Sequence, residues 1–161
     1  MKVIFISLGC DKNLVDSEVM LGLLRDGGYE FTDDETEADV IVINTCCFIH
    51  DAKEESIQTI LDMAKYKNPE NGQCKALIVA GCLGQRYHDE IAQDIPEVDV
   101  IVGTTAYDKI IEAMESALNG KSENQFASIE ALPLPETKRI LTTGGHYAYL
   151  KIAEGCDKSC T

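Results

Sequence analysis

The sequence has no long hydrophobic run. None of its apolar stretches approaches the roughly 20 residues that cross a bilayer, so no membrane span is expected. The apolar stretch near the N-terminus is short and runs into Asp11 and Lys12, which does not match a secretory signal. We therefore expect a cytoplasmic protein that has no membrane partner.

Basic residues are also scarce. The chain has 14 Lys and Arg against 28 Asp and Glu, which gives a net charge of −14. Nucleic-acid affinity comes largely from Lys and Arg that displace counterions, so direct nucleic-acid binding by this chain is not expected. An acidic balance is typical of a solvated surface, and it also suits a basic partner.

Cysteine, in contrast, is well represented. The seven cysteines are an odd number, which argues against a complete disulfide framework. Without a secretory signal they are expected to be reduced thiols, available for metal or redox chemistry.

Strand-like and helix-like hydrophobic periods alternate along the chain, which predicts βα units and an open, mostly parallel sheet flanked by helices, an α/β fold. Helices are expected after Asn13 as N-cap, over Ala52–Lys65 and around His88–Ile95. The expected strands are Val3–Leu8, Val40–Thr45, Ala76–Ala80 and Val98–Val102.

The composition changes after Gly120. The polar stretch Asn119–Gln125 and the pair Pro133 and Pro135 are typical of a linker between domains. Tyr147–Ala153 is expected to be a new strand, with little sequence after it. We expect residues 1–135 to form one domain, and residues 136–161 to be a linker and the truncated start of a second.

Three cysteines follow three of the expected strands at equal sequence intervals. Cys10, Cys46 and Cys82 are each 36 residues apart, about one strand–helix unit. The carboxyl ends of parallel strands share one edge of a sheet, so the thiols can converge there on a metal or iron–sulfur site. Buried packing is the alternative for any single cysteine. Zinc is the competing metal, although structural zinc usually has paired cysteines and four protein ligands.

Cys156 and Cys160 form a second candidate site. Two thiolates separated by three residues can reach neighbouring irons of one cluster from a single loop, although the spacing alone is weak evidence. Cys47 and Cys74 are expected to have structural roles, and the three histidines share no motif spacing.

Two groups of residues near these cysteines have simpler explanations. Asp16-Ser17-Glu18 is explained by the preference for acidic residues in the first turn of a helix. Gly9, Gly81 and Gly155 directly precede cysteines, where we expect them to allow close approach of a bulky ligand.

Several of these motifs together resemble the radical S-adenosylmethionine methylthiotransferase family, over essentially the whole chain. Within that family they look like the RimO type, which modifies a ribosomal protein, although Asp11 replaces a frequent proline and Cys47 a frequent glycine. The matching segments are Gly9-Cys10-Asp11-Lys12-Asn13, Asp16-Ser17-Glu18, Asn44-Thr45-Cys46-Cys47-Phe48-Ile49, Ala52-Lys53-Glu54-Glu55-Ser56, Gly81-Cys82-Leu83-Gly84-Gln85-Arg86-Tyr87 and Ala148-Tyr149-Leu150-Lys151-Ile152-Ala153-Glu154-Gly155-Cys156.

The resemblance implies two four-iron, four-sulfur clusters and S-adenosylmethionine as cofactors. Cys10, Cys46 and Cys82 would hold the auxiliary cluster. Cys156 and Cys160 would be two of the three ligands of the radical-generating cluster, at the start of a partial (β/α) barrel. No catalytic side chain is assigned.

The resemblance also implies a reaction. A 5′-deoxyadenosyl radical would remove hydrogen from the β-carbon of an aspartate in a small-subunit ribosomal protein, and a methylthio group would then be added there. An electron donor would reduce the cluster, and this fragment alone is expected to be inactive.

Three alternatives stay open. The chain could belong to a tRNA adenosine methylthiotransferase of the MiaB type. It could be an iron–sulfur electron-transfer or sensor module without a methylthiolated product. It could also be a zinc-bound interaction domain, which metal analysis would distinguish by zinc without sulfide.

Overall fold

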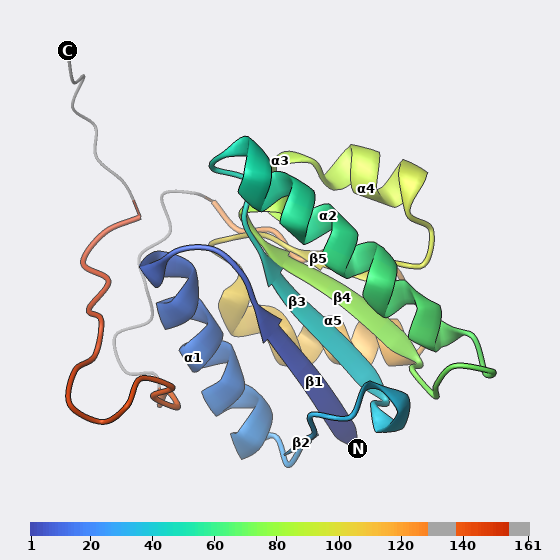
Figure 1. The fold of residues 1–161 in the computed structure, drawn as a ribbon, viewed down its shortest axis with the longest axis horizontal. Coiled ribbons are helices and arrows are strands. Elements are labelled where there is room, and N and C mark those ends of the chain that lie inside the picture. The colour runs from blue at the N-terminus through green and yellow to red at the C-terminus, as the bar shows by residue number, and fades with distance from the viewer. Residues whose placement is uncertain (129–137, 155–161) are drawn as a thin grey trace.

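The computed structural model describes residues 1–128 and 138–154. Five parallel strands form one sheet in the order β2-β1-β3-β4-β5 (Figure 1). The strands are β1 (Lys2–Ser7), β2 (Glu30–Phe31), β3 (Val40–Thr45), β4 (Ala76–Gly81) and β5 (Val100–Val102). The predicted α/β class and parallel sheet are therefore confirmed.

α-Helices connect β1 to β2, β3 to β4 and β4 to β5, as expected because neighbouring parallel strands need a long crossover connection. The α-helices are α1 (Asp11–Asp26), α2 (His50–Ala64), α3 (Cys82–Arg86), α4 (His88–Asp94) and α5 (Ile110–Leu118). Short 3-10 turns are η1 (Glu35–Glu37), η2 (Lys65–Lys67) and η3 (Tyr107–Lys109).

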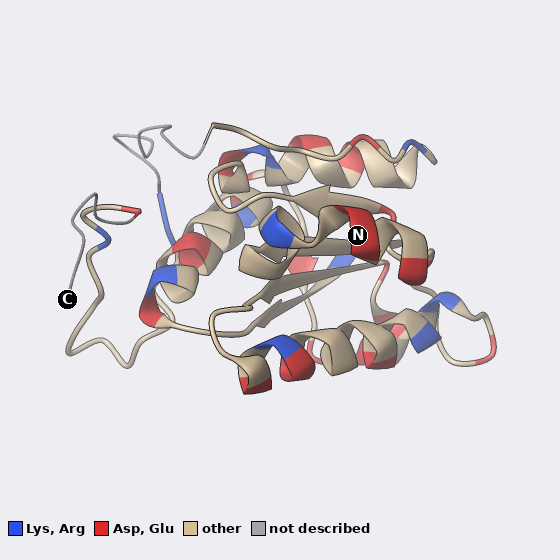
Figure 2. Ribbon diagram, turned by 90° about the horizontal axis from the view of Figure 1, so that it is seen from above, with Lys and Arg blue, Asp and Glu red and all other residues tan. Residues whose placement is uncertain are grey.

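The helices cover both faces of the sheet (Figure 2). Side chains of β3 alternate between these faces: Val40 and Val42 pack with α1 and α5, whereas Ile41 and Ile43 pack with the cluster that contains residues of α2, α3 and α4. All four side chains are fully buried. Burial on both faces explains why the central strands are continuous apolar runs rather than alternating ones.

Helix α1 differs from the expectation at its start. It begins at Asp11, with Cys10 at the N-cap position and no side-chain cap hydrogen bond, so Asn13 is not the N-cap. Instead, Asn13 lies inside the helix and is buried, with its side chain donating to the carbonyls of Leu8 and Thr45. Its Oδ1, the atom that would accept from a backbone N–H in a cap, accepts from the thiol of Cys82 instead.

Two further expectations are corrected. Asn124 and Gln125 were expected in a linker, but they bond to the edge strand β5: Ile101 N donates to Asn124 Oδ1, and Val102 and Gln125 form a parallel bridge. Tyr147–Ala153 is not a strand, and no residue of the described stretch 138–154 pairs with the sheet. An isolated extended segment cannot satisfy its backbone groups as a strand does.

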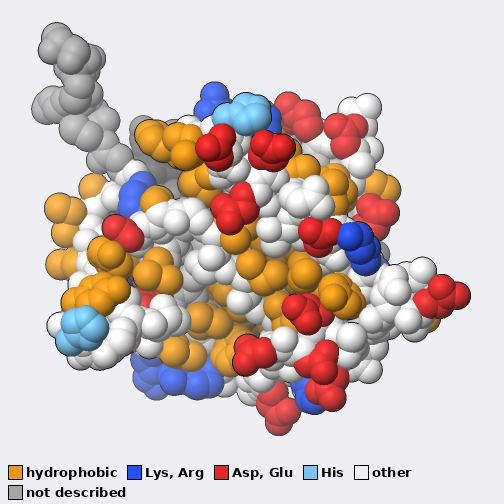
Figure 3. Space-filling view, viewed as in Figure 1, with side chains coloured by type: hydrophobic (Ala, Val, Ile, Leu, Met, Phe, Trp, Pro, Cys, Tyr) orange, Lys and Arg blue, Asp and Glu red, His pale blue; other side chains and the backbone are white. Residues whose placement is uncertain are grey.

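The surface has the acidic character expected from the composition, with acidic side chains spread over the face in Figure 3. Within the described part of the chain, no helix has the length and apolar character needed to cross a membrane. The boundary expected near residue 135 falls among residues 129–137, outside the described residues, and the two-domain division stays a prediction.

Candidate functional site

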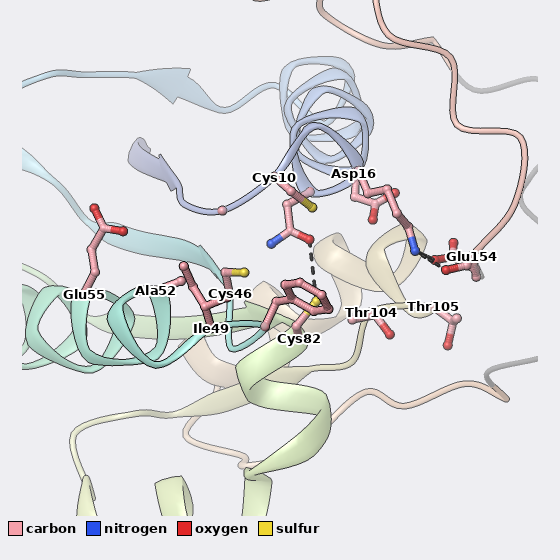
Figure 4. A pocket seen from close by; sticks show the side chains of 14 residues that line it. Cys10, Asp16, Cys46, Ile49, Ala52, Glu55, Cys82, Thr104, Thr105 and Glu154 are labelled. Carbon is pink, nitrogen blue, oxygen red and sulfur yellow. Dashed lines mark hydrogen bonds and ion pairs between the residues drawn. The ribbon is translucent and has the colours of Figure 1, made fainter. Parts of the chain in front are cut away.

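A cavity of about 940 Å³ opens at the carboxyl edge of the sheet. Cys10, Cys46 and Cys82 all line it, and their sulfur atoms face a common space in the close view (Figure 4). The three cysteines that the sequence singled out are therefore neighbours in the fold. The full lining is Gly9, Cys10, Lys12, Asn13, Asp16, Cys46, Phe48, Ile49, Ala52, Glu55, Cys82, Thr104, Thr105 and Glu154.

Each thiol is carried to the cavity by a βα junction. Thr45 and Gly81 are paired across β3 and β4, so Cys46 and Cys82 leave the sheet at the same level. Cys10 follows β1 at a larger offset, because β1 already ends at Ser7. The equal sequence spacing thus corresponds to equal positions for two of the cysteines only.

The glycines before these cysteines are required by the protein itself. Gly9 and Gly81 have φ values of +101° and +89°, which side-chain-bearing residues rarely adopt. A Cβ on Gly9 would lie 2.7 Å from Cys46 Cβ, and one on Gly81 would lie 2.3 Å from Asn44 Oδ1. Close contact between neighbouring βα loops therefore already requires glycine at both positions. That these glycines also make room for a ligand stays a prediction, and Gly155 lies outside the described residues.

Asn13 forms the polar floor of the cavity. Its amide nitrogen donates to Leu8 O at 3.2 Å and to Thr45 O at 2.9 Å, which ties the first βα loop to the second. Its Oδ1 accepts from the thiol of Cys82 at 3.7 Å. One side chain thus fixes three βα junctions relative to one another.

A second buried amide supports the first. Asn44, which is 2% exposed, donates to Asn13 O and to Ser17 Oγ, both at 2.9 Å. Ser17 also shares a 2.7 Å hydrogen bond with Ser7 Oγ. Buried polar groups are costly unless paired, and this network satisfies them while joining α1 to β1 and β3.

Ser56 fixes the backbone of Cys46 from the opposite side. Its hydroxyl accepts from Cys46 N at 3.0 Å and donates to Cys46 O at 2.9 Å, and the side chain is fully buried. Helix α2 therefore holds the second thiol in place through a single hydroxyl.

The thiols influence one another electrostatically. Burial, followed by the neighbouring Cys46, Cys47 and Cys10, raises the pKa of Cys82 to about 11, against the opposing effect of Lys12. Cys82 is therefore a protonated thiol at neutral pH in the metal-free chain. Metal binding would have to displace that proton, as it does for cysteine ligands in general.

The described residues do not contain a group of three or more His, Cys, Asp or Glu side chains arranged to hold a single metal ion. The three thiols nevertheless line one cavity and face a common space (Figure 4). Such a donor set suits a polynuclear cluster, which presents a separate metal to each thiolate, better than a tetrahedral zinc ion held by four close ligands.

The mouth of the cavity is apolar on one side and charged on another. Phe48 is 91% exposed and Ile49 is 57% exposed, although both line the cavity. Across from them, Lys12 Nζ pairs with Glu154 Oε2 at 3.4 Å. Exposed apolar side chains beside a concave site are typical of a binding surface.

The remaining cysteines are distributed as expected where they are described. Cys47 does not line the cavity and packs partly buried against the core. Cys74 is buried before β4, at the other end of that strand from Cys82, and its thiol donates to Ala76 O. Cys156 and Cys160 lie outside the described residues, so their assignment stays a prediction.

Asp16-Ser17-Glu18 needs more than the helix-dipole explanation. All three residues are buried, and Asp16 and Glu18 form ion pairs with residues more than 100 positions away in the sequence. Burial raises the pKa of Asp16 to about 6, against the opposing effect of Lys151. The carboxyl group is still ionised near neutral pH.

Asn13 and Ser56 are the supporting residues that the sequence reasoning did not identify. Both lie within segments that carry the family resemblance, one at the end of Gly9-Cys10-Asp11-Lys12-Asn13 and the other at the end of Ala52-Lys53-Glu54-Glu55-Ser56. The available signal for their supporting role was a polar residue within each motif, at a position that faces the interior of the fold.

Comparisons with known proteins agree with these motifs. A family model described as uncharacterized protein family UPF0004 matches residues 2–103. A ribosomal protein uS12 methylthiotransferase RimO from Lachnoclostridium phytofermentans is 62% identical over 161 residues, which are 100% of this chain and 36% of the relative.

Two further relatives carry the same name. The protein from Acetivibrio thermocellus is 54% identical over 170 residues, covering 99% of this chain and 36% of the relative. The protein from Symbiobacterium thermophilum is 50% identical over 159 residues, covering 99% of this chain and 32% of the relative. The chain thus spans about a third of the length of these relatives.

Proposed function

The chain belongs to the UPF0004 family, and from that premise we propose that it is the auxiliary-cluster domain of a methylthiotransferase that modifies an aspartate of ribosomal protein uS12. The observation that carries the proposal is the convergence of Cys10, Cys46 and Cys82 on one cavity. Relatives that this chain matches over 97–100% of its length are named ribosomal protein uS12 methylthiotransferase RimO.

The donor set fits a four-iron, four-sulfur cluster with three protein ligands. Thiolates are the usual ligands of such clusters, and three thiols leave one iron without a protein ligand. When bound, the cluster would supply a site at that iron for an exogenous sulfur atom. The radical-generating cluster of Cys156 and Cys160, S-adenosylmethionine and an electron donor belong to the same proposal, and a ribosomal substrate is consistent with a cytoplasmic location.

The chain's own residues would hold and orient this cofactor. The Asn13 side chain donates to the Thr45 carbonyl and accepts from the Cys82 thiol, and the Ser56 hydroxyl accepts from the backbone N–H of Cys46. Such outer contacts set the orientation of metal ligands and tune the bound metal. Phe48 and Ile49 would give an incoming polypeptide an apolar contact at the mouth.

Anaerobic reconstitution with iron and sulfide tests the cluster assignment. The wild-type chain is expected to bind about four irons and four sulfides at the auxiliary site, with the charge-transfer absorbance of an iron–sulfur cluster. Alanine at Cys10, Cys46 and Cys82 together should abolish this iron.

Cys74→Ala is the matched control and should keep the iron, because Cys74 lies away from the cavity. A second control, Cys156→Ala with Cys160→Ala, separates the two sites. Equal iron loading in the triple variant would overturn the assignment, as would zinc without sulfide.

The substrate is tested in cells that lack the full-length gene. Mass spectrometry of ribosomal protein uS12 should show loss of a methylthio group from one aspartate, with tRNA unchanged. Loss of a thiomethylated adenosine from tRNA instead would overturn the substrate assignment in favour of the tRNA-modifying type.

A further inference from the structure

Residues 138–154, here called the strap, lie along α1 (Figure 1). The first anchor is Glu18, whose side chain is 2% exposed. Its Oε1 accepts from Thr142 N at 2.7 Å, its backbone carbonyl accepts from Ile140 N at 3.0 Å, and Arg139 pairs with its carboxylate at 3.4 Å. Glu18 of α1 therefore contacts three residues near the start of the strap.

The second anchor is Lys151. Its side chain is 4% exposed and contacts the carboxylate of Asp16 at 2.5 Å and that of Glu154, with its ammonium 5.1 Å from the ring centroid of Tyr107. The hydrogen bonds to these carboxylates outweigh burial and raise the pKa of Lys151, so it is charged. A buried charge without such partners would be costly.

The residues beside Lys151 have the opposite exposure. Leu150 is 82% exposed and Ile152 is 88% exposed. Successive side chains of an extended segment point to opposite sides, so the strap turns its charge toward α1 and its apolar side chains outward. Ion pairing therefore determines how this part of the strap is oriented, because hydrophobic burial would favour the reverse.

A close backbone contact supplies a third anchor. A Cβ on Gly22 of α1 would lie 2.1 Å from Lys138 O, a distance that side-chain-bearing residues do not tolerate. The strap therefore approaches α1 where the helix has no side chain. At its other end, Glu154 lines the three-cysteine cavity and pairs with Lys12.

We propose that Asp16 and Glu18 are positioning residues that dock the strap on α1 and so deliver the chain to the rim of the three-cysteine cavity at Glu154. The sequence reaches Cys156 only two residues later. Docking would thus hold the chain at Glu154, from which the sequence continues to the second cysteine pair. The docking stands on the contacts above, whereas its use in relating two cofactors rests on the proposed function.

Amide hydrogen exchange of the metal-free 161-residue chain tests the docking. Glu18→Ala and Lys151→Met should each raise exchange in the strap about tenfold or more, since local opening is governed by the contacts of the segment itself. Exchange in β1, β3 and β4 should change by less than about twofold. Lys151→Arg keeps the charge and should retain most of the protection.

Lys65→Met is the matched control, because Lys65 forms an exposed ion pair with Asp62, next to α2 and away from the strap. Unchanged strap exchange in both test variants would overturn the proposal. A uniform rise across sheet and strap would also overturn it, since the carboxylates would then support overall stability only. Because exchange is measured without metal, failure of cluster binding would refute the proposed function while leaving this result intact.

Discussion

Gly81 offers a sharp test of how the cysteine loops are packed. It has φ +89° and ψ −158°, a region that is essentially restricted to glycine. In Gly81→Ala, the new Cβ would lie 2.3 Å from Asn44 Oδ1 and 2.6 Å from Thr45 O. Asn44 is held by two buried hydrogen bonds and Thr45 belongs to β3, so neither can move freely.

The expected cost has two parts. Adopting this backbone conformation with a side chain costs about 1–3 kcal/mol, and forcing an extra methyl into a packed site costs about 1–3 kcal/mol more. We expect Gly81→Ala to lower the free energy of unfolding by about 3 kcal/mol or more. For a chain of this size that corresponds to a fall in Tm of about 6–12 °C.

Gly28→Ala is the matched control. Gly28 also has a positive φ of +81°, but a Cβ there would meet no atom within 4 Å. We expect Gly28→Ala to lower the free energy of unfolding by about 1 kcal/mol, because only the unfavourable backbone conformation contributes. Urea unfolding at a constant m-value gives both free energies. Equal losses in the two variants would refute the argument that contact between the βα loops requires glycine at position 81.

Two further variants test individual contacts. Ser56→Ala removes both hydrogen bonds to the buried backbone of Cys46 and should lower the free energy of unfolding, measured with urea, by about 1–3 kcal/mol. Thr59→Ala removes an exposed hydroxyl of the same helix and should lower it by less than about 1 kcal/mol. Equal losses in the two variants would contradict the role of Ser56. The hydrogen bond from Lys75 lowers the pKa of Asp39 from 3.8, so the stabilisation by Asp39 is present above that pH and is lost as the pH falls through the lowered pKa. The difference in unfolding free energy between wild type and Asp39→Asn should therefore shrink on acidification below about pH 4, and a constant difference would rule this out.

The sheet was predictable because its central strands are buried on both faces. Val40–Ile43 is a continuous apolar run, and the predicted strand bounds Val40–Thr45 match β3. β2 was missed because it has only two residues, both exposed, and α3 because five residues are too few for a periodic pattern.

The common cavity of the three cysteines was predictable because topology alone brings strand ends to one edge. The residues that support it were harder to foresee. Asn13 looked like a helix cap because capping is a local preference, and only the fold reveals its contacts with the Thr45 carbonyl, 32 positions away, and with the Cys82 thiol. The contact between Asp16 and Lys151 spans 135 positions and leaves no local signal in the sequence.

The most direct test of the central claim is diffraction from crystals of the anaerobically reconstituted chain, measured at the iron absorption edge. Convergence of Cys10, Cys46 and Cys82 predicts anomalous density for one compact group of irons inside the cavity, bonded to all three sulfur atoms. Iron density at Cys47 or Cys74 instead would contradict the account. The account would also be contradicted if Cys10, Cys46 and Cys82 held no iron while the site of Cys156 and Cys160 was occupied.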